Sequence, residues 1–89
     1  MFKKKPKISI IGMGYVGLPL AIEFSKYYRV TGFDINSKRI SDLKNGIDKN
    51  LQFKRKEIIS KKIKYSDKRI SLTDTDIIIV TVPTPLKKN

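Results

Sequence analysis

The sequence predicts an α/β fold built on a parallel sheet of about four strands. Short runs rich in apolar and β-branched residues alternate with stretches that have a helical period. Hydrophobic residues make up 39% of the 89 residues and charged residues 31%, which suits one small domain with a buried core. Strands that alternate with helices form parallel sheets with right-handed crossovers.

The first predicted strand is Lys7–Ile11, whose nearly continuous apolar run is typical of a buried parallel strand. Residues 15–27 then change to a helical period, with Pro19 near the first turn, where a missing N–H costs little. The expected core face of this helix repeats every four residues and consists of Val16, Leu20 and Phe24, with Ala21 beside them.

A second strand is predicted at Arg29–Phe33, and Asp34 closes it. Asn36 and Ser37 are suitable caps for the helix that follows. Ile40 and Leu43 share one face of this helix. Gly46 is well placed to end it in a left-handed conformation.

The last third of the chain predicts a short basic helix around residues 57–61, although the basic residues before it favour capping poorly. A short third strand is expected at Ile63–Ser66. Residues 77–82 give the strongest strand pattern in the chain, which Pro83 and Pro85 end. A strand that is apolar on both faces belongs inside a sheet, and an exposed apolar edge is a liability. We therefore expect the sequence to be the front part of a larger protein.

Three glycines between the first strand and the first helix fit the pattern G-x-G-x-x-G. Gly12 turns the chain off the strand, Gly14 lets the backbone approach a pyrophosphate, and Gly17 lets the helix lie close to the strand. The exposed N–H groups of the first helical turn, together with the helix dipole, favour bound phosphates. The position of the motif between a strand and a helix predicts a dinucleotide site.

Asp34 supplies the acidic partner of this motif, since it follows the next strand roughly 20 residues after Gly12. There its carboxylate can accept hydrogen bonds from the ribose hydroxyls of an adenosine. A 2′-phosphate would be repelled, so NAD is favoured over NADP as the cofactor. Arg39 leaves two interpretations open: a solvated helix residue, or a contact with the adenosine end that would offer a partner to a 2′-phosphate.

The formal net charge is +12, from 20 basic and 8 acidic residues, which attracts polyanions at low salt. The lysines are scattered along the chain and not gathered on one helix face, and aromatic platforms interleaved with them are not evident, so we expect no nucleic acid among the partners. The chain has no cysteine and no histidine, which argues against a self-contained hydrolase or a zinc enzyme. No catalytic residue and no metal ligand is predicted.

Lysines at positions 3–5 precede a mostly apolar stretch at 8–22, and this order resembles a signal peptide. Three glycines and Pro19 interrupt this stretch, and no small-residue cleavage site follows. We expect a cytoplasmic protein with no membrane partner.

The run IGMGYVGLPLA at residues 11–21 resembles the opening of the UDP-glucose/GDP-mannose dehydrogenase family. The motifs GFDIN at 32–36, LKNG at 43–46 and VTVPTP at 80–85 resemble the same family. The resemblance implies that residues 1–89 are the N-terminal part of a Rossmann-like domain, the first half of a doubly wound NAD-binding domain. The NGID stretch with Asn50 and Leu51 looks most like the branch that acts on UDP-N-acetylhexosamines in polysaccharide biosynthesis.

The resemblance also implies roles for matching positions. Tyr15 and Val16 would meet the cofactor phosphates through their backbone N–H groups, and Asp34 and Arg39 would hold the adenosine. Thr84 would approach the nicotinamide side; its other interpretation is a turn residue between two prolines. The expected cofactor site comprises Gly12, Met13, Gly14, Tyr15, Val16, Gly17, Asp34, Arg39 and Thr84.

In this family an alcohol of a UDP-sugar is oxidised to the carboxylate of a UDP-uronic acid in two NAD-dependent steps, through a thioester on a cysteine. The full-length protein would be a homo-oligomer that binds UDP-sugar. This chain has no cysteine, so we expect it to be inactive by itself, with the substrate and dimerisation domains absent. Two alternatives remain: an NAD-binding module that senses ligands in a regulatory protein, and a small basic nucleic-acid-binding protein. The VPTP motif favours the dehydrogenase over the regulatory module, which gives no reason for it. A nucleic-acid-binding protein would need a clustered basic face and steep salt dependence.

Overall fold

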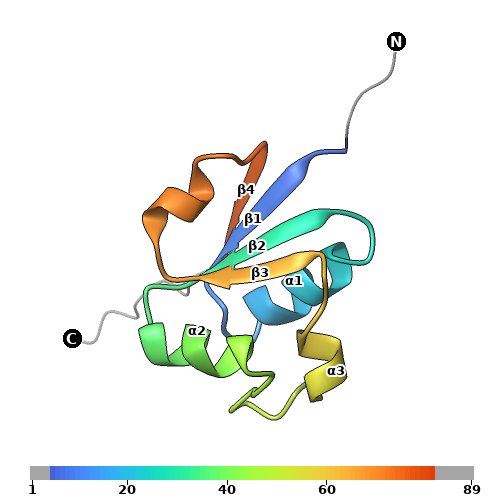
Figure 1. Ribbon diagram of the computed structural model, residues 1–89, viewed down its shortest axis with the longest axis vertical. Helices are drawn as coiled ribbons and strands as arrows, with labels where there is room; N and C mark the ends of the chain where they lie inside the picture. Colours follow the sequence, from blue (N-terminus) through green and yellow to red (C-terminus); the bar gives the residue numbers. More distant parts are fainter. Residues whose placement is uncertain (1–4, 82–89) are drawn as a thin grey trace, which may run out of the picture.

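The computed structural model describes residues 5–81. Its four strands form one parallel sheet in the order β3-β2-β1-β4 (Figure 1). The strands are β1 at Lys7–Ile11, β2 at Arg29–Phe33, β3 at Ile63–Ser66 and β4 at Ile77–Val80. The predicted α/β class and the parallel sheet are therefore confirmed.

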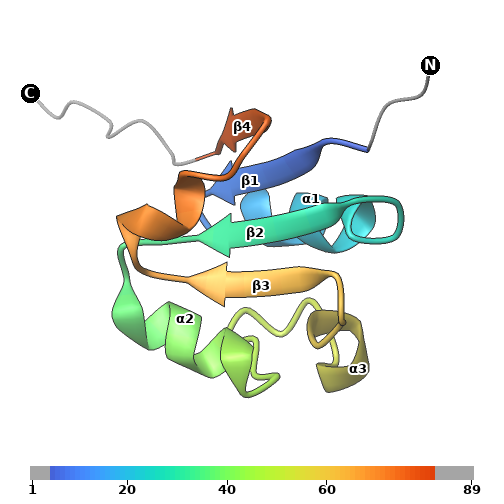
Figure 2. The same cartoon turned by 45° about the horizontal axis from the view of Figure 1, so that its top comes forward.

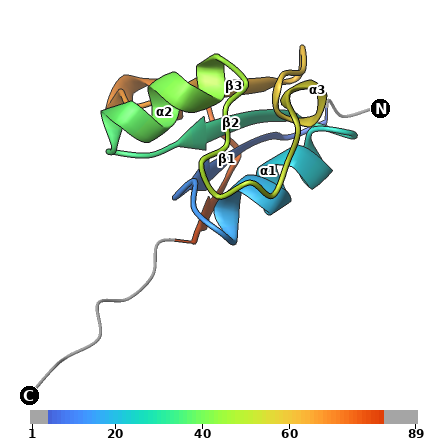
Figure 3. The same cartoon turned by 90° about the horizontal axis from the view of Figure 1, so that it is seen from below.

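Helices cover the two faces of the sheet unequally. They are α1 at Gly17–Phe24, α2 at Ser37–Lys44, α3 at Arg55–Ile58 and the 3-10 helix η1 at Arg69–Leu72. Figure 2 shows α1 behind the sheet and η1 in front of it. Figure 3 looks onto the opposite face, which carries α1, α2 and α3. The chain therefore crosses from one face to the other between β3 and β4.

The core lies between the sheet and its three α-helices. The parallel register places Ile8 beside Val30 and Val30 beside Ile63, so one row of apolar side chains crosses the strands. Figure 3 shows the helices that cover this row. The buried cluster consists of Ile8, Ile10, Met13, Leu18, Ala21, Val30, Ile40, Leu43, Ile58, Ile63 and Tyr65. At about 25 cal/mol per Å² of apolar surface, this burial is the main stabilising contribution.

The ends of α2 follow the sequence prediction. The side chain of Asn36 accepts a hydrogen bond from the N–H of Arg39 at 3.1 Å, which caps the start of the helix. Gly46 has φ of 76°, and the N–H of Ile47 donates to the carbonyl of Asp42 at 2.8 Å, which completes a Schellman ending. These contacts are local, which is why the sequence reveals them.

Two helix predictions were wrong in detail. Helix α1 begins at Gly17, not at residue 15, and Val16 is its N-cap with 60% of its surface exposed. Its fully buried hydrophobic residues are Leu18 and Ala21, because the close approach of Gly17 turns that side of the helix to the sheet. Of the predicted core face, Ala21 is buried, Leu20 and Phe24 are partly buried against the core, and only Val16 is exposed. Helix α3 begins at Arg55 instead of residue 57. There the carboxylate of Glu57 accepts from the N–H of Lys54 at 2.9 Å and caps the first turn.

Strand β4 lies at the edge of the sheet in the described part of the chain, where it pairs with β1. Ile78 is 52% exposed and Val80 is 62% exposed. Among the described residues the strand is thus apolar and largely uncovered. The predicted strand end at Val82 lies outside the described residues.

Candidate cofactor-binding site

The turn between β1 and α1 is fixed at the carboxyl ends of the strands. Gly12 has φ of 103°, a left-handed conformation that other residues rarely adopt. Its N–H donates to the carbonyl of Phe33 at 2.7 Å, so the turn begins while the chain is still bonded to β2. The predicted sharp turn off the strand is present.

Gly17 is the point at which α1 meets this turn. A Cβ built on Gly17 would collide with the carbonyl oxygen of Gly12 and lie 2.6 Å from Oγ1 of Thr81. The Thr81 hydroxyl lies 3.0 Å from the carbonyl oxygen of Ile11 and 2.9 Å from that of Gly12, within hydrogen-bonding distance of both. Thr81 thus ties the end of β4 to the turn, a role that the sequence analysis missed because the partners are distant in the chain.

Gly14 has a different environment, since a Cβ built on it would meet no atom within 4 Å. Packing within the described protein therefore does not require glycine here. The open space is what the approach of a pyrophosphate needs. The side chains of Tyr15 and Val16 next to it are exposed, so they are free to border a ligand. The first turn of α1 thus fits the phosphate half of a dinucleotide.

Asp34 lies directly beside the glycine turn, as predicted. Its Oδ2 accepts a hydrogen bond from the N–H of Met13 at 2.8 Å, and its Oδ1 accepts from the N–H of Asn36 at 2.9 Å. A carboxylate has about four acceptor positions, so two remain for ribose hydroxyls. Met13 takes part through its backbone, because its side chain is fully buried in the core.

Arg39 is turned inward, which excludes the solvated interpretation. Its Nε donates to the carbonyl of Met13 at 2.6 Å, and its Nη1 donates to Oδ1 of Asp48 at 2.9 Å. The Arg39 side chain is 11% exposed and that of Asp48 is 0% exposed. The pair joins α2 to the glycine turn and to the segment after Gly46.

Asp48 was not among the predicted site residues, and it organises the loop before α3. Besides Arg39, its carboxylate accepts from three backbone N–H groups, those of Asn50, Gln52 and Phe53. Burial alone would raise the pKa of Asp48, but Arg39 and these N–H groups together hold it below its ordinary value. One local signal was available, since an Asp side chain often accepts from the N–H two residues later.

This lowered pKa predicts how stability changes with pH. A carboxyl whose pKa is depressed by folding stabilises the native state above its ordinary value of 3.8, and that contribution is lost as the pH falls through the lower folded value. We expect Asp48→Asn to reduce the free energy of unfolding at pH 7 and to have a progressively smaller effect below about pH 4. Urea unfolding of both proteins between pH 2.5 and 7 measures this. An equal effect of the substitution at every pH contradicts it.

The two residues predicted to hold the adenosine, Asp34 and Arg39, border one hollow of about 280 Å³ at the carboxyl ends of β1 and β2. Its lining consists of Met13, Gly14, Asp34, Asn36, Lys38, Arg39, Asp42, Lys49 and Asn50. The structure thus brings Met13, Gly14, Asp34 and Arg39 together, with Gly12, Tyr15, Val16 and Gly17 in the adjoining turn. Thr84 lies outside the described residues.

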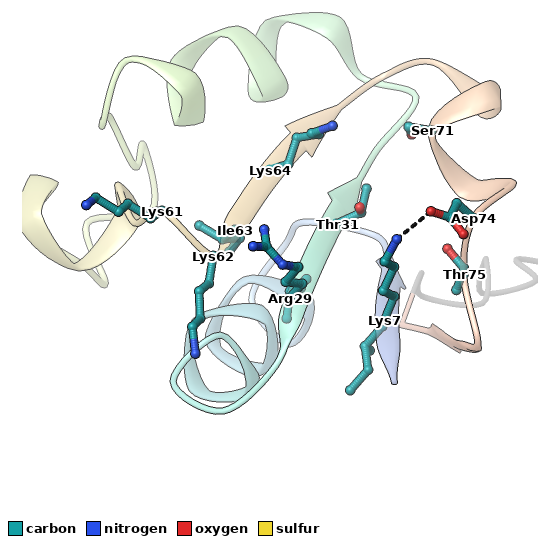
Figure 4. A pocket seen from close by; sticks show the side chains of 12 residues that line it. Lys7, Arg29, Thr31, Lys61, Lys62, Ile63, Lys64, Ser71, Asp74 and Thr75 are labelled. Carbon is teal, nitrogen blue, oxygen red and sulfur yellow. Dashed lines mark hydrogen bonds and ion pairs between the residues drawn. The ribbon is translucent and has the colours of Figure 1, made fainter. Parts of the chain in front are cut away.

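A second hollow, of about 240 Å³, lies near the amino ends of β1 and β2 and is rich in basic residues (Figure 4). Lys7 forms an ion pair with Asp74 at 2.5 Å. Figure 4 shows Lys61, Lys62 and Lys64 pointing in different directions. Because these charges diverge, the hollow does not have the converging donors of an anion site.

Residues 5–81 include no helix long and apolar enough to cross a membrane. Within the same range no three His, Cys, Asp or Glu side chains are grouped to hold a metal ion.

The glycine turn, the carboxylate after β2 and the strand order β3-β2-β1-β4 define a Rossmann-type dinucleotide-binding domain. Residues 6–89 match the UDP-glucose/GDP-mannose dehydrogenase family, NAD binding domain. The chain belongs to this family, its cofactor is NAD, and the resemblance seen in the sequence is confirmed.

Two named dehydrogenases with similar sequences support the assignment of this chain to the family. A UDP-N-acetyl-D-glucosamine 6-dehydrogenase of Salmonella typhi is 48% identical over 90% of this chain and 19% of its own length. One from Pseudomonas aeruginosa is 41% identical over 97% of this chain and 21% of its own length. This chain therefore spans about one fifth of the length of the relatives it matches.

Solved structures agree with the fold. The UDP-D-ManNAc dehydrogenase of Pyrococcus horikoshii superposes with a TM-score of 0.78 at 36% identity, over 91% of this chain and 21% of that one. The UDP-N-acetyl-mannosamine dehydrogenase Cap5O of Staphylococcus aureus superposes with a TM-score of 0.76 at 37% identity, over 93% of this chain and 21% of that one.

Proposed function

We propose that this chain supplies the N-terminal, NAD-binding part of a nucleotide-sugar 6-dehydrogenase that oxidises a UDP-N-acetylhexosamine to a UDP-uronic acid for surface polysaccharide biosynthesis. The observation that carries the cofactor half of the proposal is the bond from the Met13 N–H to the Asp34 carboxylate, at 2.8 Å. It joins the phosphate turn to the ribose acceptor. The names of the relatives, UDP-N-acetyl-D-glucosamine 6-dehydrogenase among them, support the substrate class.

The residues divide the binding of NAD between them. The backbone N–H groups at Gly14, Tyr15 and Val16 would hold the pyrophosphate at the start of α1, where the helix dipole favours negative charge. The carboxylate of Asp34 would accept from the ribose hydroxyls of the adenosine. Thr84 would lie on the nicotinamide side. When bound, NAD accepts hydride, and everything else assigned to this chain is binding and orientation.

The chemical step needs groups that this sequence does not contain. A thioester intermediate requires a cysteine, and the chain has none. We therefore propose that the chain binds NAD without oxidising a sugar. We further propose that a full-length protein binds the UDP-sugar in a separate domain, forms a homo-oligomer and acts in the cytoplasm, the compartment in which NAD and UDP-sugars meet.

Replacing Asp34 tests the cofactor assignment. We expect wild-type protein to bind NAD more tightly than NADP, and Asp34→Asn to bind NAD at least tenfold more weakly, because charge-assisted bonds to the ribose are lost. The discrimination against NADP should also fall, because the repulsion of the 2′-phosphate is removed. Calorimetric titration of both cofactors measures this, with circular dichroism to show that the variant is folded.

Glu23→Ala is the matched control, since Glu23 is an exposed acidic residue of α1 that pairs with Lys26. Glu23 does not line the hollow, so the loss of its negative charge should leave the affinities for NAD and for NADP unchanged. Equal binding of NAD and NADP by the wild-type protein would refute the role of Asp34.

A further inference from the structure

Arg39 stands where a cation would change cofactor preference. It lies on the first turn of α2, five positions after Asp34, and lines the hollow assigned to the adenosine. In dinucleotide-binding domains an arginine near this position accommodates the 2′-phosphate of NADP. A guanidinium free to move here would therefore weaken the preference for NAD that Asp34 creates.

The structure fixes this guanidinium in the wall of the hollow and does not leave it free to move, since the side chain is only 11% exposed. Two of its nitrogens are engaged, Nε with the carbonyl of Met13 and Nη1 with Asp48. The third, Nη2, is buried without a hydrogen-bond partner. Its burial shows that the edge of the guanidinium faces protein and not solvent. Leaving a buried donor unpaired costs free energy, so the inward position needs a strong partner to hold it.

Asp48 is that partner. Its side chain is fully buried and is itself fixed by three backbone N–H groups, so its position does not depend on Arg39. A rigid, buried carboxylate holds a guanidinium more firmly than an exposed one, because water screens the attraction less.

The other cations at the rim of the hollow also have a carboxylate nearby. Nζ of Lys38 lies 2.9 Å from Asp42, and Nζ of Lys49 lies 3.9 Å from the same carboxylate. The two lysines share this one carboxylate, so it offsets only part of their positive charge, and Arg39 is the cation of the hollow that is both buried and fixed.

We propose that Asp48 is a positioning residue that sets cofactor preference, because it holds Arg39 inward and so denies its guanidinium to a 2′-phosphate. This inference rests on the proposed function, since it concerns the same NAD site. Asp34 repels the extra phosphate, and Asp48 withholds the arginine that would attract it.

The test compares NAD and NADP binding to the wild-type chain and to Asp48→Asn, which keeps the size of the side chain and one acceptor oxygen. Release of Arg39 should improve NADP binding relative to NAD by roughly tenfold, the effect of one added charge-assisted pair. The double variant Asp48→Asn with Arg39→Gln should lose this gain. A gain that persists in the double variant overturns the proposal, because it does not come from Arg39.

Asp67→Asn controls for the loss of one negative charge at the same edge of the sheet. Asp67 follows β3, whose last residue Ser66 accepts from the N–H of Asp34 at 3.1 Å, and its salt bridge is with Lys68. This control should leave the ratio of the two affinities unchanged. A shift as large as that of Asp48→Asn overturns the proposal.

A measurement on the wild-type chain does not depend on whether the variants fold. The Nε–H proton of Arg39, followed by NMR in protein with ¹⁵N-labelled arginine, should exchange slowly with solvent and keep its chemical shift when NADP is added. Fast exchange, or a shift that NADP induces and NAD does not, overturns the inward position. If the folded wild-type chain binds no NAD, the proposed function fails; if it binds NAD but Asp48→Asn leaves the NADP ratio unchanged, only the role of Asp48 fails.

Discussion

Gly17→Ala is expected to destabilise the chain by about 3 kcal/mol or more, since even milder overpacking costs about 1–3 kcal/mol. The added Cβ would overlap the carbonyl oxygen of Gly12 and press on Oγ1 of Thr81, 2.6 Å away. The Gly12 carbonyl belongs to a turn that is bonded to β2, so it cannot move aside without loss. A domain of this size has on the order of 5–10 kcal/mol of stability in total. Urea unfolding followed by circular dichroism gives the change.

Gly14→Ala is the matched control, because it adds the same methyl group two residues into the same turn. A Cβ at Gly14 meets no atom within 4 Å, and Gly14 is not among the residues with positive φ. We expect its free energy of unfolding to change by less than about 1 kcal/mol. NAD binding should nevertheless weaken at least tenfold, because the methyl group fills the space through which the pyrophosphate approaches.

These two glycines therefore separate folding from binding. If Gly17→Ala proves as stable as wild type, the close approach of α1 to the turn is not needed for folding. If Gly14→Ala binds NAD normally, the open space at Gly14 is not where the pyrophosphate lies. Either result would remove one of the mechanical roles assigned to the motif.

Asp48→Ala is expected to have the second large effect on stability. The substitution leaves the guanidinium of Arg39 buried without its carboxylate, and breaking a buried pair in this way costs about 3–5 kcal/mol. The three N–H groups of the loop before α3 lose their acceptor as well. We expect a lower midpoint in urea unfolding and faster amide exchange at Asn50, Gln52 and Phe53.

Asp74→Ala is the comparison for this variant, because it removes a carboxylate from an ion pair that is exposed. In that pair, Asp74 and Lys7 are joined at the other end of the sheet, with both side chains at least half exposed. Pairs of this kind contribute about 0–1 kcal/mol. A loss in Asp48→Ala no greater than that in Asp74→Ala would mean that the loop is held by other contacts.

The local features of the fold could be predicted because their causes lie within a few residues. Three strands have the bounds that their apolar runs predict, Lys7–Ile11, Arg29–Phe33 and Ile63–Ser66. The Asn36 cap and the left-handed ending at Gly46 depend on hydrogen bonds that span five positions at most. The glycine turn and Asp34 could be placed together because the carboxyl ends of neighbouring parallel strands meet at one edge of the sheet.

The remaining features depend on groups that are far apart in the chain. The bond from Arg39 to Met13 spans 26 positions and the contact of Thr81 with Gly12 spans 69, so no local pattern reveals either. The apolar period placed Leu20, Ala21 and Phe24 correctly against the core, but it missed Leu18, because the close fit at Gly17 sets how the helix is rotated.

The sequence by itself determined that this protein has a parallel sheet with an NAD-binding turn, since strand patterns, caps and glycines are short-range properties. Only the tertiary structure decided how the turn is held and where Arg39 points. Buried ion pairs and close backbone contacts form only when segments distant in sequence are packed together, with water excluded from between them.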